Sequence, residues 1–415
     1  MKIAVVGGGS TYPPELVDGF ARLGSVVDEL VLIDPAASRL EIVGAFAARI
    51  FNHHGHPGKV TWTTDLDAGA TDADAAVIQL RVGGQNARIS DETFPLACGC
   101  VGQETTGAGG LAKALRTVPV VLDVADRVRR RAKPGAWIID FTNPVGIVTR
   151  ALLDAGHRAV GLCNVAIGFQ RRFAAFLGVD PSAVLLDHVG LNHLTWERAA
   201  YVDGVDQLPT LLSEHLSEIS SEVDLPPAVL RSLGIVPSYY LSYYYEHDRH
   251  VRDAVGAPTR GQRVAEIEAT LLDMYRDITL TEKPALLGER GGAFYSEAAV
   301  GLLASLHGLD DDAVHAVNVR NNGTLPFLPD HAVIEVPARA GLATLPVSPV
   351  APDLAALITH VWGYEELALD AALRGGRDRV YRALLAHPLV GQHEYAAKLA
   401  DDLIWTGRDY LAWAR

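Results

Sequence analysis

The sequence predicts an α/β protein whose first part is built on a parallel β-sheet. Apolar runs of strand length alternate with helical patterns through the first 165 residues. The apolar runs are rich in β-branched residues and show little polar alternation, which is typical of strands buried on both faces of a parallel sheet. A run of three glycines follows the first strand directly. Together these observations predict a Rossmann-type sheet, with ligand groups outside the carboxyl ends of its strands.

The elements of this first part are expected in a regular order. Strands are expected at Ile3–Val6, Leu30–Ile33, Ala76–Leu80, Trp137–Phe141 and Val160–Cys163. Helices are expected between them at Pro14–Leu23, Ser38–Phe51 and Leu111–Arg131. Strand, helix and strand in this succession form βαβ units, which place consecutive strands parallel in one sheet.

The pattern loosens after about residue 165. Short strands are expected at Val184–Val189 and Thr195–Val202, followed by a mostly helical stretch with an apolar, proline-punctuated insert near Leu325–Pro349. No low-complexity linker separates the two parts of the chain. We therefore expect two domains, residues 1–165 and residues 166–415, the second being a mixed α/β unit packed tightly on the first.

Charge and composition exclude several classes of partner. The 415 residues carry a formal net charge of −14, which disfavours binding to nucleic acid or to an anionic membrane and favours a small-molecule partner. No signal-peptide pattern and no apolar run long enough to span a bilayer is present, so a cytoplasmic location is expected. Three cysteines, Cys98, Cys100 and Cys163, do not suggest a disulfide framework and leave individual thiols for packing or metal binding.

The glycine run predicts a dinucleotide site. Glycines after a first strand let the backbone turn sharply and approach a pyrophosphate, which the following helix N-terminus also favours. The third glycine of the usual fingerprint is replaced by Tyr12, so a tight turn without a ligand remains an alternative. An acidic residue ending the second strand suits ribose hydroxyls and disfavours a 2′-phosphate, so NAD is expected rather than NADP. The candidate nucleotide-binding residues are Gly7, Gly9, Ser10 and Asp34.

Polar residues follow several of the predicted strands and predict a ligand cleft. These clusters are Gln79–Gln85 with Arg88, Gly102–Gly107, Phe141–Pro144, Gly161–Asn164 and Gly190–His193. Each cluster also has a plainer interpretation by itself. Asn143-Pro144, for example, is also a turn signal. A single buried cysteine such as Cys163 is usually a small apolar residue, and a single histidine such as His193 is more often hydrogen-bonded than metal-bound.

Combined, these motifs resemble the family 4 glycoside hydrolases along nearly the whole chain. The motifs that carry the resemblance are Gly7–Thr11, Glu15-Leu16, Gly102–Gly107, Ala114–Arg116, Phe141–Pro144, Gly161–Asn164, Gly190–His193 and Arg320–Gly323. The resemblance implies that NAD is the cofactor and that Thr11 belongs to its binding turn. It also implies Mn²⁺, or another divalent metal, held at Cys163 and His193.

The resemblance further implies an unusual route to hydrolysis. Hydride transfer from the sugar C3 to NAD makes a ketone that acidifies the C2 hydrogen, the metal stabilises the enolate, and the C1 substituent is eliminated. Water then adds and NADH returns the hydride. The family pattern Tyr-Leu-Arg-Tyr-Tyr aligns its leading tyrosine, the implied base, with Tyr240. The alternative for Tyr240, Tyr243 and Tyr244 is an aromatic packing face, because they share helical spacing.

The substrate implied by the resemblance is a 6-phospho-β-glucoside. Cys163 followed by Asn164, instead of His and Asp, is similar to the β-linked branch of the family. The family's substrate contacts fall on Arg88, Asn143, Asn164 and Arg260. Ser242 replaces the Arg of the tyrosine pattern, which leaves an unphosphorylated or differently substituted β-glycoside as an alternative.

Two other kinds of protein share the predicted sheet. The first is an NAD-dependent 2-hydroxy-acid dehydrogenase, and the second is a non-catalytic NAD sensor. Neither needs Cys163, His193 and Tyr240 together, so both are less favoured. The resemblance finally implies a homodimer or homotetramer.

Overall fold

The computed structural model describes residues 1–22, 27–292, 294–339 and 342–414. Within these ranges, thirteen strands form one continuous sheet, in the order β10-β8-β7-β12-β11-β6-β5-β4-β1-β2-β3, with β13 beside β12 and β9 beside β8. Six of them are parallel and follow the order 3-2-1-4-5-6 of a doubly wound dinucleotide-binding sheet. They are β1 (Lys2–Val6), β2 (Glu29–Ile33), β3 (Lys59–Thr63), β4 (Ala75–Ile78), β5 (Trp137–Asp140) and β6 (Ala159–Leu162).

The five strands predicted for this part are confirmed, with ends shifted by one or two residues. Strand β3 was not predicted, because its Lys-Val-Thr-Trp-Thr sequence alternates polar and apolar residues at the sheet edge and only Val60 is buried. The predicted helices correspond to α1, α2 and α5, and the predicted end of the first, Leu23, lies outside the described residues. The helix bounds are α1 (Pro13–Arg22), α2 (Ala37–His53), α3 (Leu66–Ala70), α4 (Gly84–Thr93), α5 (Gly107–Arg131) and α6 (Val145–Asp154).

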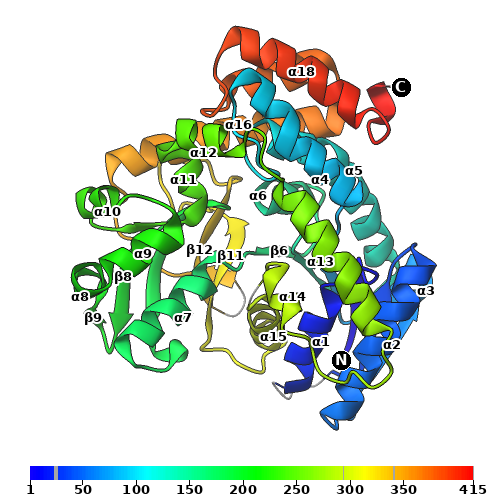
Figure 1. Cartoon of the computed structure of the whole chain (residues 1–415). Helices are drawn as coiled ribbons and strands as arrows, with labels where there is room; N and C mark the ends of the chain where they lie inside the picture. Colours follow the sequence, from blue (N-terminus) through cyan, green and yellow to red (C-terminus); the bar gives the residue numbers. More distant parts are fainter. Residues whose placement is uncertain (23–26, 293, 340–341, 415) are drawn as a thin grey trace.

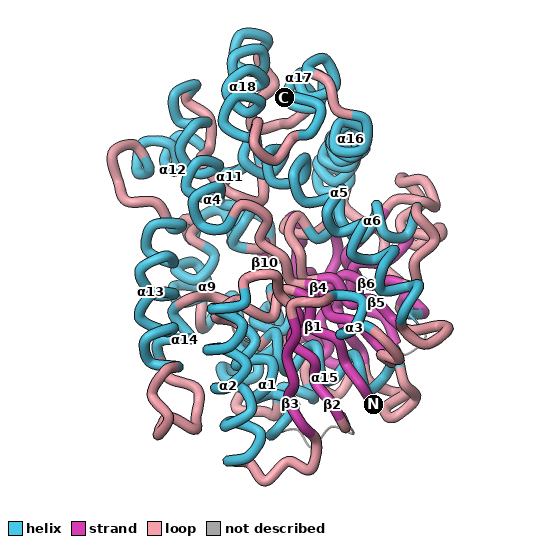
Figure 2. Tube along the Cα trace, turned by 90° about the vertical axis from the view of Figure 1, so that its right-hand side faces the viewer, coloured by secondary structure: helices cyan, strands magenta, loops and turns pink. Residues whose placement is uncertain are grey.

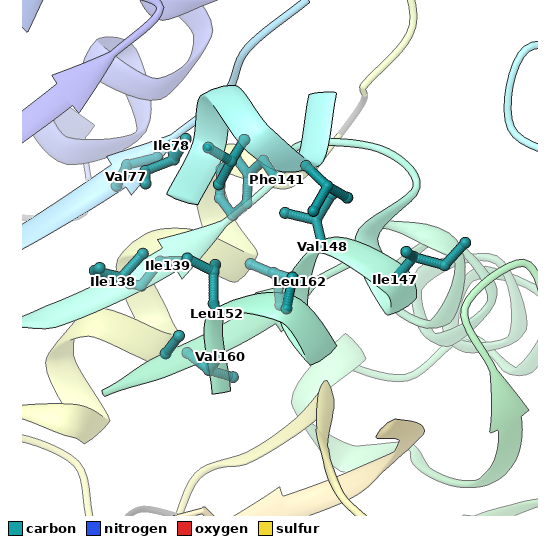
Figure 3. Packing of buried hydrophobic residues seen from close by; sticks show 14 of the residues in the cluster. Val77, Ile78, Ile138, Ile139, Phe141, Ile147, Val148, Leu152, Val160 and Leu162 are labelled. Carbon is teal, nitrogen blue, oxygen red and sulfur yellow. The ribbon is translucent and has the colours of Figure 1, made fainter. Parts of the chain in front are cut away.

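Helices cover both faces of the parallel strands. Helices α1 and α2 pack together with α15 (Tyr295–Leu306), while α3 and α6 both pack against α5, and the strands run between the two groups (Figure 2). Burial on both faces explains why these strands are apolar throughout. Figure 3 shows the resulting core, in which Ile139 of β5 and Leu162 of β6 lie beside Val148 and Leu152 of α6.

The sheet continues past β6 as an antiparallel half. β11 (Val314–Arg320) pairs with β6, β12 (Val333–Arg339) follows, and then β7 (Leu185–Leu191), β8 (Leu194–Val202) and β10 (Val236–Pro237). The two strands expected near residues 184–202 are therefore confirmed as β7 and β8. The apolar insert supplies β12, whereas β11 was not predicted. The short strands β9 (Val205–Asp206) and β13 (Ala343–Thr344) lie beside the main path.

Helices surround the antiparallel half and cap one end of the molecule (Figure 1). The last three helices, orange to red in Figure 1, stack on one another, and α16, α17 and α18 all pack against α5. None of the described helices is both long and apolar enough to cross a membrane. The remaining helices are α7 (Val165–Leu177), α8 (Leu208–Glu214), α9 (Leu216–Val223), α10 (Pro227–Leu233), α11 (Ser242–Tyr245), α12 (His247–Ala254), α13 (Arg260–Tyr275), α14 (Leu286–Glu289), α16 (Pro352–Arg374), α17 (Arg377–Ala386) and α18 (His393–Gly407).

Candidate active site

A cavity of about 1040 Å³ lies at the carboxyl ends of the parallel strands, where both halves of the sheet contribute to its wall. Thr11 and Cys163 are buried and are not among the described lining residues. The other predicted site residues all line this one cavity. They are Gly7, Gly9, Ser10, Asp34, Arg88, Asn143, Asn164, His193, Tyr240 and Arg260.

The glycine turn is held against the end of β2. The backbone N–H groups of Gly7 and Gly8 both donate to the carbonyl oxygen of Ile33, each at 2.9 Å. Gly7 has φ of 95°, and a Cβ atom there would clash with the carbonyl oxygen of Gln79. Only glycine fits both the conformation and the space. The carboxylate of Asp34 accepts a hydrogen bond from the N–H of Gly9 at 3.0 Å. The residue predicted to bind the ribose therefore lies directly beside the glycine turn.

Arg290, which was not predicted, contacts the predicted nucleotide turn. Its guanidinium donates to Ser10 Oγ at 3.0 Å and to Thr11 Oγ1 at 2.8 Å, and it pairs with Glu268 of α13 at 3.0 Å. The side chain lines the cavity. A fixed positive charge beside a glycine turn suits a pyrophosphate. The only cue in the sequence is the Arg290-Gly-Gly292 triplet, which lies 280 residues from the turn and matches no general phosphate motif.

Two amide side chains in the cavity have polar atoms with no partner. Gln79 follows β4 and Asn143 follows β5. The amide oxygen and nitrogen of Gln79 and the amide oxygen of Asn143 are buried and form no hydrogen bond among the described residues. Unpaired buried polar atoms are costly, so their place in a cleft fits hydrogen bonds to a bound molecule. With the glycine turn and Asp34, the residues present fit a dinucleotide.

The two predicted metal ligands follow strands in different halves of the sheet, with β11 and β12 between those strands. Cys163 follows β6, and His193 occupies the two-residue turn between β7 and β8. His193 has φ of 64°, a left-handed conformation that few residues other than glycine adopt. At Gly190, φ is 149° and a Cβ atom would clash with the carbonyl oxygen of Leu194, so the turn needs glycine there. The sequence Gly-Leu-Asn-His thus fixes where the imidazole lies.

Tyr240 lies against this pair. Its ring is stacked on that of His193, with centroids 3.7 Å apart and planes 15° from parallel. Burial raises the pKa of Tyr240 well above its usual value, and the neighbouring Tyr239 and Cys163 raise it further. Burial also raises the pKa of Cys163, and so does the charge of Glu335. Both groups are neutral in this environment, and a divalent cation is the kind of neighbour that would deprotonate them.

The donor set fits a metal ion that keeps open positions. A thiolate and an imidazole are ordinary ligands of transition metals. Within the described ranges, no group of three or more His, Cys, Asp and Glu side chains is arranged to hold a metal. Two protein ligands leave coordination positions to which substrate oxygens can bind.

The substrate candidates Arg88 and Arg260 form a positive region of the cavity wall. Arg88 pairs with Glu92 at 2.7 Å and with Glu104 at 3.2 Å. Both side chains line the cavity. Burial lowers the pKa of Arg260, and so does the positive charge of Arg88. Like charges kept together in a cleft are suited to an anion.

Glu104 and Lys113 complete this region, and neither was assigned a role from the sequence. Lys113 contacts Glu104 at 2.7 Å, and burial lowers the pKa of the lysine although the charge of Glu104 opposes this. Glu104 also pairs with Arg81 and Arg88, so its single charge faces three cations. The motif Gly102–Gly107 was the available signal for this cluster.

Ser242, which stands where the family pattern has Arg, does not reach the cavity wall described here. It is buried, its hydroxyl donates to the carbonyl oxygen of Tyr239 at 2.7 Å, and it contacts His250 Nε2 at 2.9 Å. Neither of these contacts of Ser242 involves Arg88 or Arg260.

Comparison with known proteins decides the family. The family profile described as "Family 4 glycosyl hydrolase" matches residues 2–179, and the profile of its C-terminal domain matches residues 188–390. The chain belongs to glycosyl hydrolase family 4. This family 4 enzyme is 35% identical to the "Probable 6-phospho-beta-glucosidase" of Bacillus subtilis, covering 99% of this chain and 97% of the relative. It is also 35% identical to the "6-phospho-beta-glucosidase BglT" of Thermotoga maritima, covering 99% of both.

Solved structures agree with this assignment. The Thermotoga maritima 6-phospho-beta glucosidase with NAD and glucose-6-phosphate matches with a TM-score of 0.92 at 34% identity, over 99% of each chain. A form with manganese, NAD⁺ and glucose-6-phosphate matches at 0.90 and 33% identity, again over 99% of each chain. A malate dehydrogenase from Salinibacter ruber shares the fold alone, with a TM-score of 0.54 and 17% identity over 91% of this chain and 99% of its own. The dehydrogenase alternative is thus not favoured for this family 4 glycosidase.

Proposed function

We propose that this family 4 enzyme hydrolyses 6-phospho-β-glucosides and uses NAD together with Mn²⁺ or another divalent metal. The observation that carries the proposal is that Arg88 and Arg260 share one cavity with His193 and Tyr240. A phosphorylated sugar can then have its phosphate at the two guanidinium groups while its ring lies at the metal ligands. The names and bound ligands of the similar proteins support this substrate class.

The nucleotide would be held by the glycine turn. Gly7 and Gly9 allow close approach of a pyrophosphate, Ser10 and Arg290 supply hydrogen-bond donors, and Asp34 accepts from the ribose hydroxyls. Thr11 is fully buried and bonded to Arg290, so we assign it a supporting role in the same turn.

The chemistry would divide between the cofactors and the side chains. When bound, NAD takes the C3 hydride and the metal supplies Lewis acidity for the C2 carbanion. Cys163 and His193 hold the metal, and Tyr240 removes the C2 proton. Asn143 and Asn164 line the same cavity and orient the sugar. Net hydrolysis leaves the nucleotide in its starting state.

The test of the substrate is a paired assay. Matched aryl β-glucosides with and without a 6-phosphate are given to the enzyme with NAD, Mn²⁺ and a reductant, and aglycone release is followed. We expect turnover of the phosphorylated member and at least about 100-fold lower kcat/KM for the other, since two charge-assisted contacts are lost. Equal rates would contradict the phosphate assignment and favour an unphosphorylated β-glycoside.

The test of the route uses solvent deuterium. In D₂O the product sugar should carry deuterium at C2, and Tyr240→Phe should reduce turnover by about 100-fold or more while NAD binding is unchanged. Product without label at C2 would exclude elimination, and near-normal turnover of the Phe variant would exclude Tyr240 as the base.

We also propose that the enzyme acts as a homodimer or homotetramer in the cytoplasm. The C-terminal helices expose several large apolar side chains, including Leu373 at 52% and Trp405 at 67% exposure, which suits contact with a second copy. Size-exclusion chromatography with light scattering checks this, and a monomer at micromolar concentration would contradict it.

A further inference from the structure

The hydrogen bonds around His193 determine which of its ring nitrogens carries the proton. His193 Nδ1 lies 3.0 Å from Thr105 Oγ1. Thr105 Oγ1 in turn lies 2.9 Å from the side-chain oxygen of Gln103. A hydroxyl has one proton to donate. Whether Thr105 donates it to Gln103 or to His193 depends on which amide atom of Gln103 faces the hydroxyl.

Gln103 presents an oxygen that can only accept. The same amide atom receives the backbone N–H of Thr106 at 2.9 Å and the backbone N–H of Thr105. Backbone N–H groups are donors, so the atom they meet is the oxygen of the amide. The Thr105 hydroxyl must therefore donate its proton to Gln103.

With its proton committed to Gln103, Thr105 Oγ1 faces His193 only as an acceptor. The bond at 3.0 Å then requires a proton on His193 Nδ1. A neutral imidazole protonated at Nδ1 has its lone pair at Nε2, which is the atom left for a metal. Stacking against Tyr240 and the left-handed backbone at His193 hold the ring in place.

We propose that Thr105 is a positioning residue that fixes His193 in the Nδ1–H tautomer, so that Nε2 binds the divalent metal. This inference rests on the proposed function of His193 as a metal ligand. It gives the predicted motif Gly102–Gly107 a role: Gln103 orients the Thr105 hydroxyl, and the hydroxyl orients the ligand. Partners of this kind typically change metal affinity by about 10- to 100-fold.

The test is Mn²⁺ affinity, measured on the NAD-bound enzyme without substrate from the electron paramagnetic resonance signal of free Mn²⁺. Thr105→Val keeps the shape of the side chain but removes the acceptor, so we expect binding to weaken about 10- to 100-fold. Thr105→Ser keeps the hydroxyl and should bind within about twofold of the wild type. NAD affinity should stay the same in both variants.

Thr106→Val is the matched control. It removes a hydroxyl from the next residue of the same loop, but that hydroxyl contacts Tyr244 Oη at 3.1 Å and not His193. We expect Mn²⁺ affinity within about twofold of the wild type. Wild-type affinity in Thr105→Val, or equal losses in Thr105→Val and Thr106→Val, would overturn the proposal.

A second measurement does not depend on the folding of any Thr105 variant. In metal-free wild-type enzyme with ¹⁵N-labelled histidine, the His193 signals, assigned by their loss in His193→Gln, should show a protonated Nδ1 and an unprotonated Nε2. The opposite tautomer would overturn the proposal. If His193→Gln binds Mn²⁺ normally, His193 is not a metal ligand and the proposed metal site is wrong. If His193→Gln loses Mn²⁺ binding but Thr105→Val does not, only the role of Thr105 is wrong.

Discussion

The parallel and antiparallel halves of the sheet build their parts of the site in different ways. In the parallel half, the buried strand residues are apolar except for Asp140 at the end of β5, and the nucleotide turn depends mainly on backbone N–H groups and glycines. In the antiparallel half, His188, Glu197 and Glu335 are buried inside the sheet itself. The nucleotide turn of the first half relies mainly on backbone geometry, with the side chains of Asp34 and Arg290 beside it. The second half instead surrounds the turn that carries His193 with buried charged side chains.

The buried charges form a connected network. His188 contacts Glu197 at 2.7 Å through Nδ1 and Glu335 at 3.1 Å through Nε2. The second oxygen of Glu335 accepts from the amide groups of Asn192 and Asn318, both at 2.9 Å. Against the effect of burial, the charge of Glu197 raises the pKa of His188 to about 10. Because Asn192 shares its two-residue turn with His193, the network anchors the proposed metal ligand.

Breaking this network should have the largest effect. His188→Leu leaves Glu197 and Glu335 buried without their cation, so we expect the free energy of unfolding to fall by about 3–5 kcal/mol. Chemical denaturation of the metal-free enzyme measures the loss. The matched control is His157→Leu, a buried histidine near the parallel half whose ion pair, at 3.4 Å, is with the partly exposed carboxylate of Asp126, so its removal leaves no carboxylate buried. Similar losses of unfolding free energy in both variants would contradict the view that only the antiparallel half depends on buried charges.

Glu365 of α16, which is partly buried beside Glu366 and Arg150, tests the cost of a carboxylate outside this network. Burial raises its pKa to about 8, and the charge of Glu366 adds to the shift. A carboxyl group with a raised folded-state pKa stabilises the protein fully below its unfolded pKa, and this stability is lost as the pH rises through about 8. We expect Glu365→Gln to match the wild type near pH 5 and to be about 2–3 kcal/mol more stable at pH 8.5.

Thermal unfolding across that pH range measures the effect. Glu366→Gln is the comparison variant, because it removes the charge that adds to the pKa shift of Glu365 but leaves the carboxyl group of Glu365 in place; its gain at high pH should be smaller than that of Glu365→Gln. A constant difference between Glu365→Gln and the wild type at all pH values would mean that the carboxyl group is ionised throughout.

A change of backbone geometry in the glycine turn should by itself weaken NAD binding. Gly7→Ala introduces a Cβ where φ is 95° and where the Gln79 carbonyl oxygen already stands. We expect NAD affinity to fall about 30-fold, equivalent to about 2 kcal/mol, while Mn²⁺ affinity in the absence of NAD stays within twofold. Titration of NADH fluorescence measures the first and paramagnetic resonance the second. Gly168→Ala, on α7 with open space around its Cβ, should change neither.

The same contrast explains what could be predicted from the sequence. Local signals marked the glycine turn, Asp34 and five parallel strands, because a βαβ pattern is contiguous in the chain. Cys163, His193 and Tyr240 were found only through a family resemblance, since no short spacing joins them. Arg290 and Glu335 were missed because each acts through partners more than 100 residues away, as in the contact of Arg290 with Ser10. Edge strand β3 was missed because its polar faces weaken the apolar signal.

The smallest predicted effect concerns Arg88 and Arg260, the pair proposed to face the phosphate of the substrate. Arg260→Met keeps the aliphatic stem but removes one cation facing the proposed phosphate, so KM for a 6-phosphorylated β-glucoside should rise about tenfold with kcat changed less than threefold. Arg263→Met, on the same helix but 66% exposed and 3.5 Å from Glu289, is the matched control and should leave KM unchanged. Initial-rate kinetics separate the two. A lower kcat with unchanged KM would indicate that Arg260 acts at the reacting part of the sugar and not at its phosphate. The group of residues around the proposed metal would then include Arg260 as well as Cys163 and His193.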